Sequence, residues 1–278
     1  MTIKQALFWA NSELKSSCYQ NNSYATANLL LSATLQLDKT RLLLIEDNTL
    51  SLSNLKIYQS FITRAAQDEP LEYITNAASF YSRDFLVNKD VLIPRPETEI
   101  LIDIIKQNIG DKNTQARFCE IGVGSGIIST TLALGYPQAT FIATDISPGA
   151  IKVARQNAKK WDCQNITFAH TNLLDNINEP IDILISNPPY IKNAEILEKN
   201  VASYEPHLAL FGGERGTELL FSIIDLAFAR SVRMLFCEMG YDQREAVREY
   251  VQNNYCYKRL EFYKDLARLD RGFFLSSH

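Results

Sequence analysis

The chain has 278 residues, enough for one large domain or two modest ones. Its residues are 46% hydrophobic and 22% charged, which are ordinary values for a soluble globular protein. The net charge is −4, and residues 1–90 hold 8 Lys or Arg against 9 Asp or Glu, so nothing indicates a broad nucleic-acid-binding face.

Residues 1–70 have the pattern of amphipathic helices. Two segments carry apolar residues at helical spacing: Ile3, Ala6, Leu7, Ala10 and Leu14, then Tyr24, Ala27, Leu30 and Leu31. Ser23 is a candidate N-cap for the second segment, and residues 41–45 and 55–66 predict two more helices. Because we find no catalytic cluster here, we expect a small helical bundle that docks onto a partner.

Residues 71–93 differ in composition from the helical segment. The aromatic and β-branched runs 73–75, 80–81 and 85–87 predict a β-hairpin linker, with its turn near residues 76–78. Next comes Pro94-Arg95-Pro96-Glu97-Thr98-Glu99, followed by an apolar helix over residues 100–109. Pro96 suits the first turn of that helix. The sequence leaves open whether this motif also has a functional role.

Strands and helices alternate from residue 116 onward, as in a parallel α/β domain. The predicted strands are residues 118–121, 140–143, 166–169, 181–185 and 234–238, with a closing pair at 259–263 and 272–275. The predicted helices among them are residues 127–134 and 151–161.

A glycine-rich loop, Gly122-Val123-Gly124-Ser125-Gly126, follows the first of these strands. Asp145 stands at the end of the next strand. The loop and this acid together fit a nucleotide ligand whose ribose hydroxyls bind the carboxylate, and NAD is one such ligand. Three features favour a methyl donor instead. Ile127 stands where a dinucleotide site has its last glycine, Glu120 precedes the loop and suits a cationic amino-acid group, and Asn-Pro-Pro-Tyr follows a later strand.

That later strand ends in Asn187-Pro188-Pro189-Tyr190. Each proline fixes its own φ and keeps the preceding residue out of the helical region, so the loop should be stiff and extended. Two prolines alone would only end a strand. Together with the glycine-rich loop, however, they resemble the motif of S-adenosylmethionine-dependent methyltransferases that act on planar nitrogens.

The acceptor of such a site is an NH₂ group whose lone pair is conjugated, which makes the nitrogen a poor nucleophile. If the side-chain oxygen of Asn187 and the carbonyl of Pro188 each accept one N–H, the lone pair points at the methyl group. We expect Tyr190 to pack on the planar group; plain core packing is the alternative for this residue.

Over nearly its whole length the chain resembles the bacterial HemK/PrmC family of peptide chain release factor glutamine N5-methyltransferases. The resemblance rests on Val91-Leu-Ile-Pro-Arg-Pro-Glu-Thr-Glu99, the glycine-rich loop, Asp145, Asn187-Pro-Pro-Tyr-Ile191, Tyr204-Glu-Pro206, Gly212-Gly213 and Asp270-Arg271. It implies a Rossmann-like class I methyltransferase domain (α/β, seven strands, residues 94–278) behind a small N-terminal helical bundle. It also implies methylation of the glutamine in the Gly-Gly-Gln loop of class 1 release factors.

The resemblance and the chemistry above give the predicted site residues. The expected catalytic residues are Asn187, Pro188 and Tyr190. The expected cofactor residues are Glu120, Gly122, Val123, Gly124, Ser125, Gly126, Asp145, Ile146, Asn172, Leu173 and Asn187. The expected substrate residues are Asn187, Pro188, Pro189, Tyr190, Arg95 and Glu97, and we expect no metal.

Three departures from the family pattern are minor. Asn76 stands for a usual Gly, and Asn tolerates positive φ. Glu120 stands for a usual Asp, and Asn172 stands for a common acid, although its amide oxygen can still accept from the adenine amine. One rival function is adenine N6-methylation of DNA or RNA, which the neutral to acidic charge balance of the chain disfavours. The other is a non-catalytic adaptor that binds S-adenosylmethionine or the release factor without turnover.

Five cysteines, far apart and without a C-x-x-C pair, indicate a reducing cytoplasm rather than a disulfide or zinc framework. The N-terminal sequence is not that of a signal peptide, and no apolar run approaches the ~18 residues of a membrane span. We therefore expect a cytoplasmic monomer that binds release factors and neither membranes nor, stably, nucleic acid.

Overall fold

The computed structural model describes residues 1–277, which divide into two compact units. The first, called here the helical unit, comprises Met1–Ala77 together with Leu197–Tyr204. The second, called here the α/β unit, comprises residues 78–196 and 205–277. Within the described residues, no helix is both long enough and apolar enough to span a membrane.

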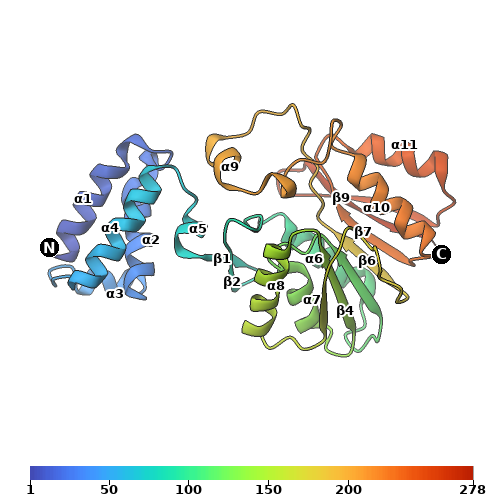
Figure 1. Cartoon of the computed structure of the whole chain (residues 1–278), viewed down its shortest axis with the longest axis horizontal. Coiled ribbons are helices and arrows are strands. Elements are labelled where there is room, and N and C mark those ends of the chain that lie inside the picture. The colour runs from blue at the N-terminus through green and yellow to red at the C-terminus, as the bar shows by residue number, and fades with distance from the viewer. Residues whose placement is uncertain (278) are drawn as a thin grey trace. The chain divides into compact units, whose positions relative to one another are not determined.

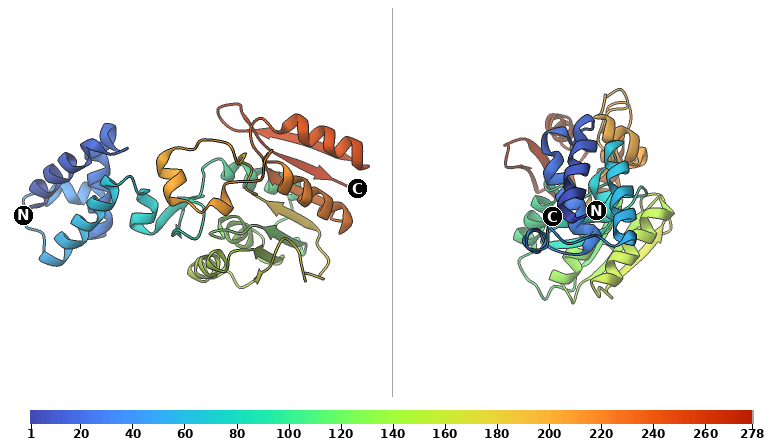
Figure 2. Two further views of the ribbon diagram at one scale, coloured as in Figure 1. Left: turned by 45° about the horizontal axis from the view of Figure 1, so that its top comes forward. Right: turned by 90° about the vertical axis from the view of Figure 1, so that its left-hand side faces the viewer.

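The helices of residues 3–66, blue to cyan in Figures 1 and 2, pack against one another. Their apolar faces form the core of the helical unit. Its α-helices are α1 Ile3–Glu13, α2 Ser23–Leu35, α3 Lys39–Leu44, α4 Leu52–Ala66, α5 Leu71–Thr75 and α9 Lys199–Tyr204, with 3₁₀ turns at Leu14–Ser16 and Gln20–Asn22. The residues whose spacing predicted α1 and α2 are buried in its core, except Tyr24, which is exposed. Ser23 does not cap α2: its hydroxyl donates to Asn11 instead, and Asn22 occupies the N-cap position.

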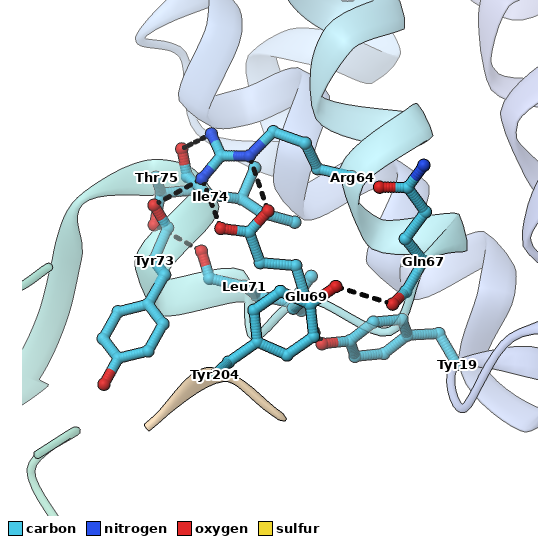
Figure 3. Close-up of polar contacts among 9 residues, drawn as sticks. All are labelled: Tyr19, Arg64, Gln67, Glu69, Leu71, Tyr73, Ile74, Thr75 and Tyr204. Carbon is cyan, nitrogen blue, oxygen red and sulfur yellow. Dashed lines mark hydrogen bonds and ion pairs between the residues drawn. The ribbon is translucent and has the colours of Figure 1, made fainter. Parts of the chain in front are cut away.

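Residues 73–75 were expected in a strand of the hairpin and instead lie in helix α5, Leu71–Thr75 (Figure 3). The reason is tertiary. The Arg64 guanidinium donates to the carbonyls of Tyr73 (3.0 Å) and Ile74 (3.3 Å), two groups that a helix end leaves without partners. Asn76 then closes the helix in the left-handed conformation, with φ of 54°. The hairpin follows as β1 Ala77–Phe80 and β2 Arg83–Leu86, with its turn at residues 81–82.

Arg64 also forms a bidentate pair with Glu69, at 2.7 and 2.8 Å (Figure 3). The backbone beside this pair is held by two tyrosines. The Tyr19 hydroxyl donates to the Glu69 carbonyl, and the hydroxyl of Tyr204, on α9, donates to the Gln67 carbonyl, both at 2.8 Å. A segment more than 120 residues further along the chain thus completes the helical unit.

The α/β unit contains a sheet with strand order β5-β4-β3-β6-β7-β9-β8 among the described residues. Figure 1 labels β4, β6, β7 and β9 of this sheet. Its strands are β3 Arg117–Ile121, β4 Thr140–Asp145, β5 Ile166–His170, β6 Ile183–Ser186, β7 Met234–Glu238, β8 Arg259–Lys264 and β9 Asp270–Ser276. Neighbours are parallel from β5 to β7, and β9 is antiparallel to both β7 and β8. The predicted seven-stranded sheet with its closing pair is confirmed.

Helices cover both faces of this sheet (Figure 2). They are α6 Thr98–Ile109, α7 Ile127–Gly135, α8 Pro148–Lys160, α10 Glu218–Ala229 and α11 Arg244–Asn254. Because side chains alternate along a strand, Ile183 and Ile185 pack in the core with α6 and α7, and Leu184 packs in the core with α10 and α11. The sequence did not predict α10 and α11.

Candidate active site

The carboxyl ends of β3, β4 and β6 surround a cavity of about 370 Å³ in the α/β unit. β3 lies between β4 and β6 in the sheet, and the residues that follow each strand line this cavity. In parallel α/β sheets, ligands bind just outside this edge. The order of strands thus brings together loops that are up to about seventy residues apart in the sequence.

The glycine-rich loop forms one wall of the cavity. Gly122 and Gly124 have φ of 75° and 52°, and a Cβ added at either would lie more than 4 Å from every described residue other than its chain neighbours. Gly126 has φ of 81° and lies against Ala154 of α8, so it serves close packing rather than the cavity wall. Glycine is required here because other residues rarely adopt positive φ. The loop exposes backbone toward the cavity.

Asp145 at the end of β4 holds this loop in place. Its Oδ2 accepts the N–H of Gly124 at 2.9 Å, and its Oδ1 accepts the N–H of Ser147 at 2.8 Å. Burial raises the pKa of Asp145, and these two hydrogen bonds lower it. Each carboxylate oxygen keeps a further lone pair for a ligand donor.

Glu120, the fourth residue of β3, is 2% exposed and lines the cavity. Its Oε2 accepts the backbone N–H of Ser129 at 2.9 Å and the Ser129 hydroxyl. Burial raises the pKa of Glu120 to about 8, although both bonds to Ser129 oppose this rise. A cation placed beside this carboxyl would favour its ionised form.

Asn187 follows β6 and begins a loop, residues 187–190. Contacts with Gln243, Leu210 and two glycines fix the position of this loop. Gln243 donates to the carbonyls of Tyr190 and Gly216, each at 3.0 Å. The N–H of Ile191 donates to the carbonyl of Leu210 at 3.0 Å. A Cβ at Gly212 would collide with the carbonyl of Pro189, and one at Gly216 with that of Tyr190. Both glycines therefore allow the close backbone approach that keeps the loop rigid.

The Pro94–Glu99 motif contributes Pro94, Arg95 and Thr98 to the lining of the cavity. Arg95 lines the cavity, and its Nη2 lies 2.6 Å from Oε1 of Glu205, whose Oε2 accepts the N–H of Ile93. Thr98 Oγ1 accepts a hydrogen bond from Nδ2 of Asn187 at 3.2 Å. Glu97 is the N-cap residue of α6 and is not among the residues that line the cavity.

Most of the predicted site residues line this single cavity. They are Arg95, Glu120, Gly122, Val123, Gly124, Ser125, Asp145, Ile146, Asn172, Leu173, Asn187 and Pro189. Four others do not line it, namely Glu97, Gly126, Pro188 and Tyr190. Tyr190 is half-buried, and burial raises the pKa of its hydroxyl.

Sequence reasoning missed Thr98, Ser129 and Gln243. Thr98 stood inside a motif that was noticed, but its partner Asn187 lies 89 residues away in the sequence. Gln243 and Ser129 belong to no motif, and only the fold brings them to the loop and to Glu120.

The residues present fit S-adenosylmethionine, the expected cofactor. A carboxyl in an apolar wall suits its ammonium group, a carboxylate with spare lone pairs suits ribose hydroxyls, and apolar Ile146 and Leu173 beside Asn172 suit adenine. The open space over Gly122 and Gly124 allows backbone and ligand to approach closely.

Comparison with known families gives two matches. A family described as the PrmC N-terminal domain matches residues 5–75, and one described as the methyltransferase small domain matches residues 96–210. The fold is shared with the catalytic domain of human METTL16, with a TM-score of 0.58 at 14% identity over 78% of this chain and 92% of that one. A likeness of this kind concerns the fold alone.

Curated relatives extend the similarity along the chain. A release factor glutamine methyltransferase from Koribacter versatilis is 34% identical over 91% of both chains. The one from Staphylococcus aureus is 39% identical over 76% of this chain and 77% of that protein. A bifunctional methyltransferase from Rickettsia typhi is 35% identical over 97% of this chain, which spans only 56% of that longer protein. The chain belongs to the release factor glutamine methyltransferase family.

Proposed function

We propose that this chain methylates the side-chain amide nitrogen of the glutamine in the Gly-Gly-Gln loop of class 1 peptide chain release factors, in support of translation termination. The observation that carries the proposal is the rigid Asn187–Tyr190 loop beside the cavity, with the Asn187 amide turned so that Nδ2 is bonded to Thr98. Family membership supports the same substrate.

Bound S-adenosylmethionine supplies a methyl group on a sulfonium centre. We assign Glu120 to its cationic amino-acid end, the backbone of residues 122–126 and Asp145 to its ribose side, and Ile146, Asn172 and Leu173 to the adenine. These roles agree with the positions of the side chains around the cavity. Asp145 would accept from both ribose hydroxyls.

The chain's own contribution to the reaction is orientation. Oδ1 of Asn187 and the carbonyl of Pro188 each accept one N–H of the glutamine amide, which directs the nitrogen lone pair toward the methyl group. Orientation of this kind can account for several kcal/mol of the barrier, since well-oriented intramolecular reactions gain ~7–11 kcal/mol. Tyr190 packs against the amide plane and limits water. The methylated nitrogen then loses its extra proton to solvent.

Residues 1–70 serve, in this proposal, as the domain that docks the body of the release factor, residues 71–93 as the linker, and residues 94–278 as the methyltransferase domain. A loop tip offers little contact area, and specific interfaces bury more than ~1,000 Å². The helical unit exposes large apolar side chains: Phe8 (65%), Leu43 (58%), Leu44 (81%) and Leu52 (79%). Such side chains suit a protein partner. The protein would act as a cytoplasmic monomer, with no stable nucleic-acid binding.

The deciding experiment uses labelled S-adenosylmethionine and purified release factor. Methyl transfer is expected to the intact factor and to disappear when the loop glutamine is replaced by alanine. Adenine-containing DNA and RNA serve as competing acceptors, and transfer to them alone would refute the proposal. Label on the factor that does not depend on the loop glutamine would also refute it.

A further inference from the structure

Asn157 is a polar residue on the buried face of α8. The other buried residues of this helix are apolar, namely Ala150, Ile151, Val153, Ala154 and Ala158. Asn157 itself is 0% exposed. A buried amide is costly unless its hydrogen bonds are made, so the partners of this side chain should explain why it stands here.

The Asn157 amide bonds to both backbone groups of Leu86, the last residue of β2. Its Oδ1 accepts the Leu86 N–H at 2.7 Å, and its Nδ2 donates to the Leu86 carbonyl at 2.9 Å. Two residues that face each other in an antiparallel ladder exchange hydrogen bonds in the same way. The side chain therefore supports the end of the hairpin as a neighbouring strand would. A two-stranded hairpin is marginally stable alone, so it depends on such support.

The same amide also bonds to the glycine-rich loop. Nδ2 of Asn157 donates to the carbonyl of Ser125, a residue that is 3% exposed, at 2.8 Å. The following N–H, that of Gly126, donates to the Val123 carbonyl at 2.8 Å. Both polar groups of the peptide between Ser125 and Gly126 are thus bonded, which fixes the orientation of this peptide in the loop.

The three hydrogen bonds allow one orientation of the amide. The nitrogen of an asparagine side chain carries two hydrogens, and here both point at carbonyls, while the oxygen faces an N–H. A reversed amide would place its oxygen against the two carbonyls and its NH₂ group against the Leu86 N–H. One side chain therefore joins the hairpin to the loop that lines the cofactor cavity.

We propose that Asn157 is a positioning residue that couples the cofactor loop to the hairpin. It holds the Ser125 carbonyl and the end of β2 at once, so opening of the hairpin at Leu86 releases the loop as well. S-adenosylmethionine binds the ordered loop more tightly than the released one. Its binding therefore keeps the hairpin closed, and closure of the hairpin strengthens its binding by the same factor. This coupling goes beyond the proposed methylation of release factors and does not depend on that substrate.

Hydrogen exchange of the Leu86 N–H in the whole protein tests the coupling. Saturating S-adenosylmethionine should slow this exchange at least about fivefold in wild type, the low end of typical coupling between two sites. The Tyr255 N–H, at the end of α11, should keep its exchange rate. In Asn157→Leu, which keeps the size and loses the amide, Leu86 should exchange faster and no longer respond to the cofactor. No slowing in wild type, equal slowing at Tyr255, or an equal response in Asn157→Leu would overturn the inference.

Lys160→Met is the matched variant, because it weakens the hairpin and keeps the amide. Lys160, at the end of α8, donates to the Asp84 carbonyl of β2 at 2.6 Å. In this variant we expect faster exchange at Leu86 and the same fold of slowing by S-adenosylmethionine as in wild type. If the slowing disappeared here too, it would reflect the stability of the hairpin and not the Asn157 amide, and the inference would be overturned.

Calorimetry measures the effect on the cofactor itself. Asn157→Asp keeps an acceptor for the Leu86 N–H and loses both donors, and it replaces Asn157→Leu in the exchange experiment if that variant does not fold. In either variant the Kd for S-adenosylmethionine should rise about tenfold, because the buried Ser125 carbonyl loses its partner. Val153→Ala, at another buried position of α8, controls for lost stability and should stay within about twofold of wild type. A wild-type Kd in the Asn157 variants, or an equal rise in Val153→Ala, would overturn the positioning role.

Discussion

Two pairs of acidic side chains, one in each unit, lie in contrasting surroundings. In the α/β unit, Glu120 and Glu238 are buried, and burial raises their pKa values to about 8 and about 7. In the helical unit, Glu69 is bound by Arg64, and Asp68 accepts from the Cys18 N–H and from Lys199. The Cys18 bond, followed by Lys199, lowers the pKa of Asp68. Asp68 and Glu69 thus tie segments of the helical unit together, whereas Glu120 and Glu238 of the α/β unit are buried in a costly state, Glu120 at the cavity.

If methyl transfer depends on the α/β unit alone, the largest loss of activity should follow from replacing Asn187, whose amide orients the acceptor. We expect Asn187→Ala to lower turnover by roughly 10²-fold and to leave the affinity for S-adenosylmethionine nearly unchanged. Single-turnover rates with labelled cofactor, beside calorimetric Kd values, check both parts. A near-wild-type single-turnover rate would eliminate the amide clamp.

A somewhat smaller effect should appear in cofactor binding. Asp145→Ala should weaken S-adenosylmethionine affinity by roughly 1.5–3 kcal/mol, the range for hydrogen bonds to charged groups. Calorimetry on the folded variant measures this change. Asp145→Asn keeps one acceptor oxygen and serves as the control, with a smaller expected loss. Unchanged affinity in the alanine variant would mean that Asp145 does not hold the ribose.

The helical unit should affect recognition only. Phe8→Asp or Leu44→Asp should raise the KM for whole release factor by about fivefold through lost apolar contact, with activity on a short Gly-Gly-Gln peptide unchanged. Leu266→Asp is the matched control, since Leu266 is fully exposed in the α/β unit. Equal losses on factor and peptide would contradict docking by the helical unit.

The smallest effect concerns pH and stability. The folded-state pKa of Glu120 is raised from 4.5 to about 8, so its stabilising contribution is present below the unfolded-state value and is lost as pH rises through about 8. Glu120→Gln lacks this titration. The free energy of unfolding of wild type relative to Glu120→Gln should therefore fall by about 1 kcal/mol or more between about pH 5 and about pH 9. Denaturant titrations measure it, and a constant difference would show that burial does not perturb Glu120.

The sequence predicted those parts of the fold that local patterns determine. The β-branched run at residues 181–185 and the two prolines after it identified β6 and its loop, and glycine spacing identified the cavity wall. The α5 segment was wrong because its aromatic and β-branched residues favour a strand, and Arg64, seven residues upstream of its start, satisfies a helix end instead. Helix α10 was missed although its buried residues Leu220, Ile223, Ile224 and Ala227 have the i, i+3, i+4, i+7 spacing of an amphipathic helix.

Contacts in the site could be predicted only between residues that belong to one known sequence pattern. Asp145 and Gly124 could be paired in advance because a known cofactor pattern links them. The contact of Thr98 with Asn187 depends instead on the position where α6 begins relative to β6. It is not encoded within a single stretch of sequence.

The discontinuity of the helical unit has a consequence for protein synthesis. Residues 1–77 leave the ribosome first, but the 197–204 segment, with Tyr204 and Lys199, follows only after about 120 more residues. Translation proceeds at ~5–20 residues per second, so the helices of residues 1–77 are made roughly 6–24 s before the last element of their unit. During that interval the Gln67 carbonyl lacks the Tyr204 hydroxyl, and Asp68 lacks Lys199. The order of synthesis thus leaves the helical unit incomplete until β3–β6 of the sheet, with the glycine-rich loop and Asn187, have already been made.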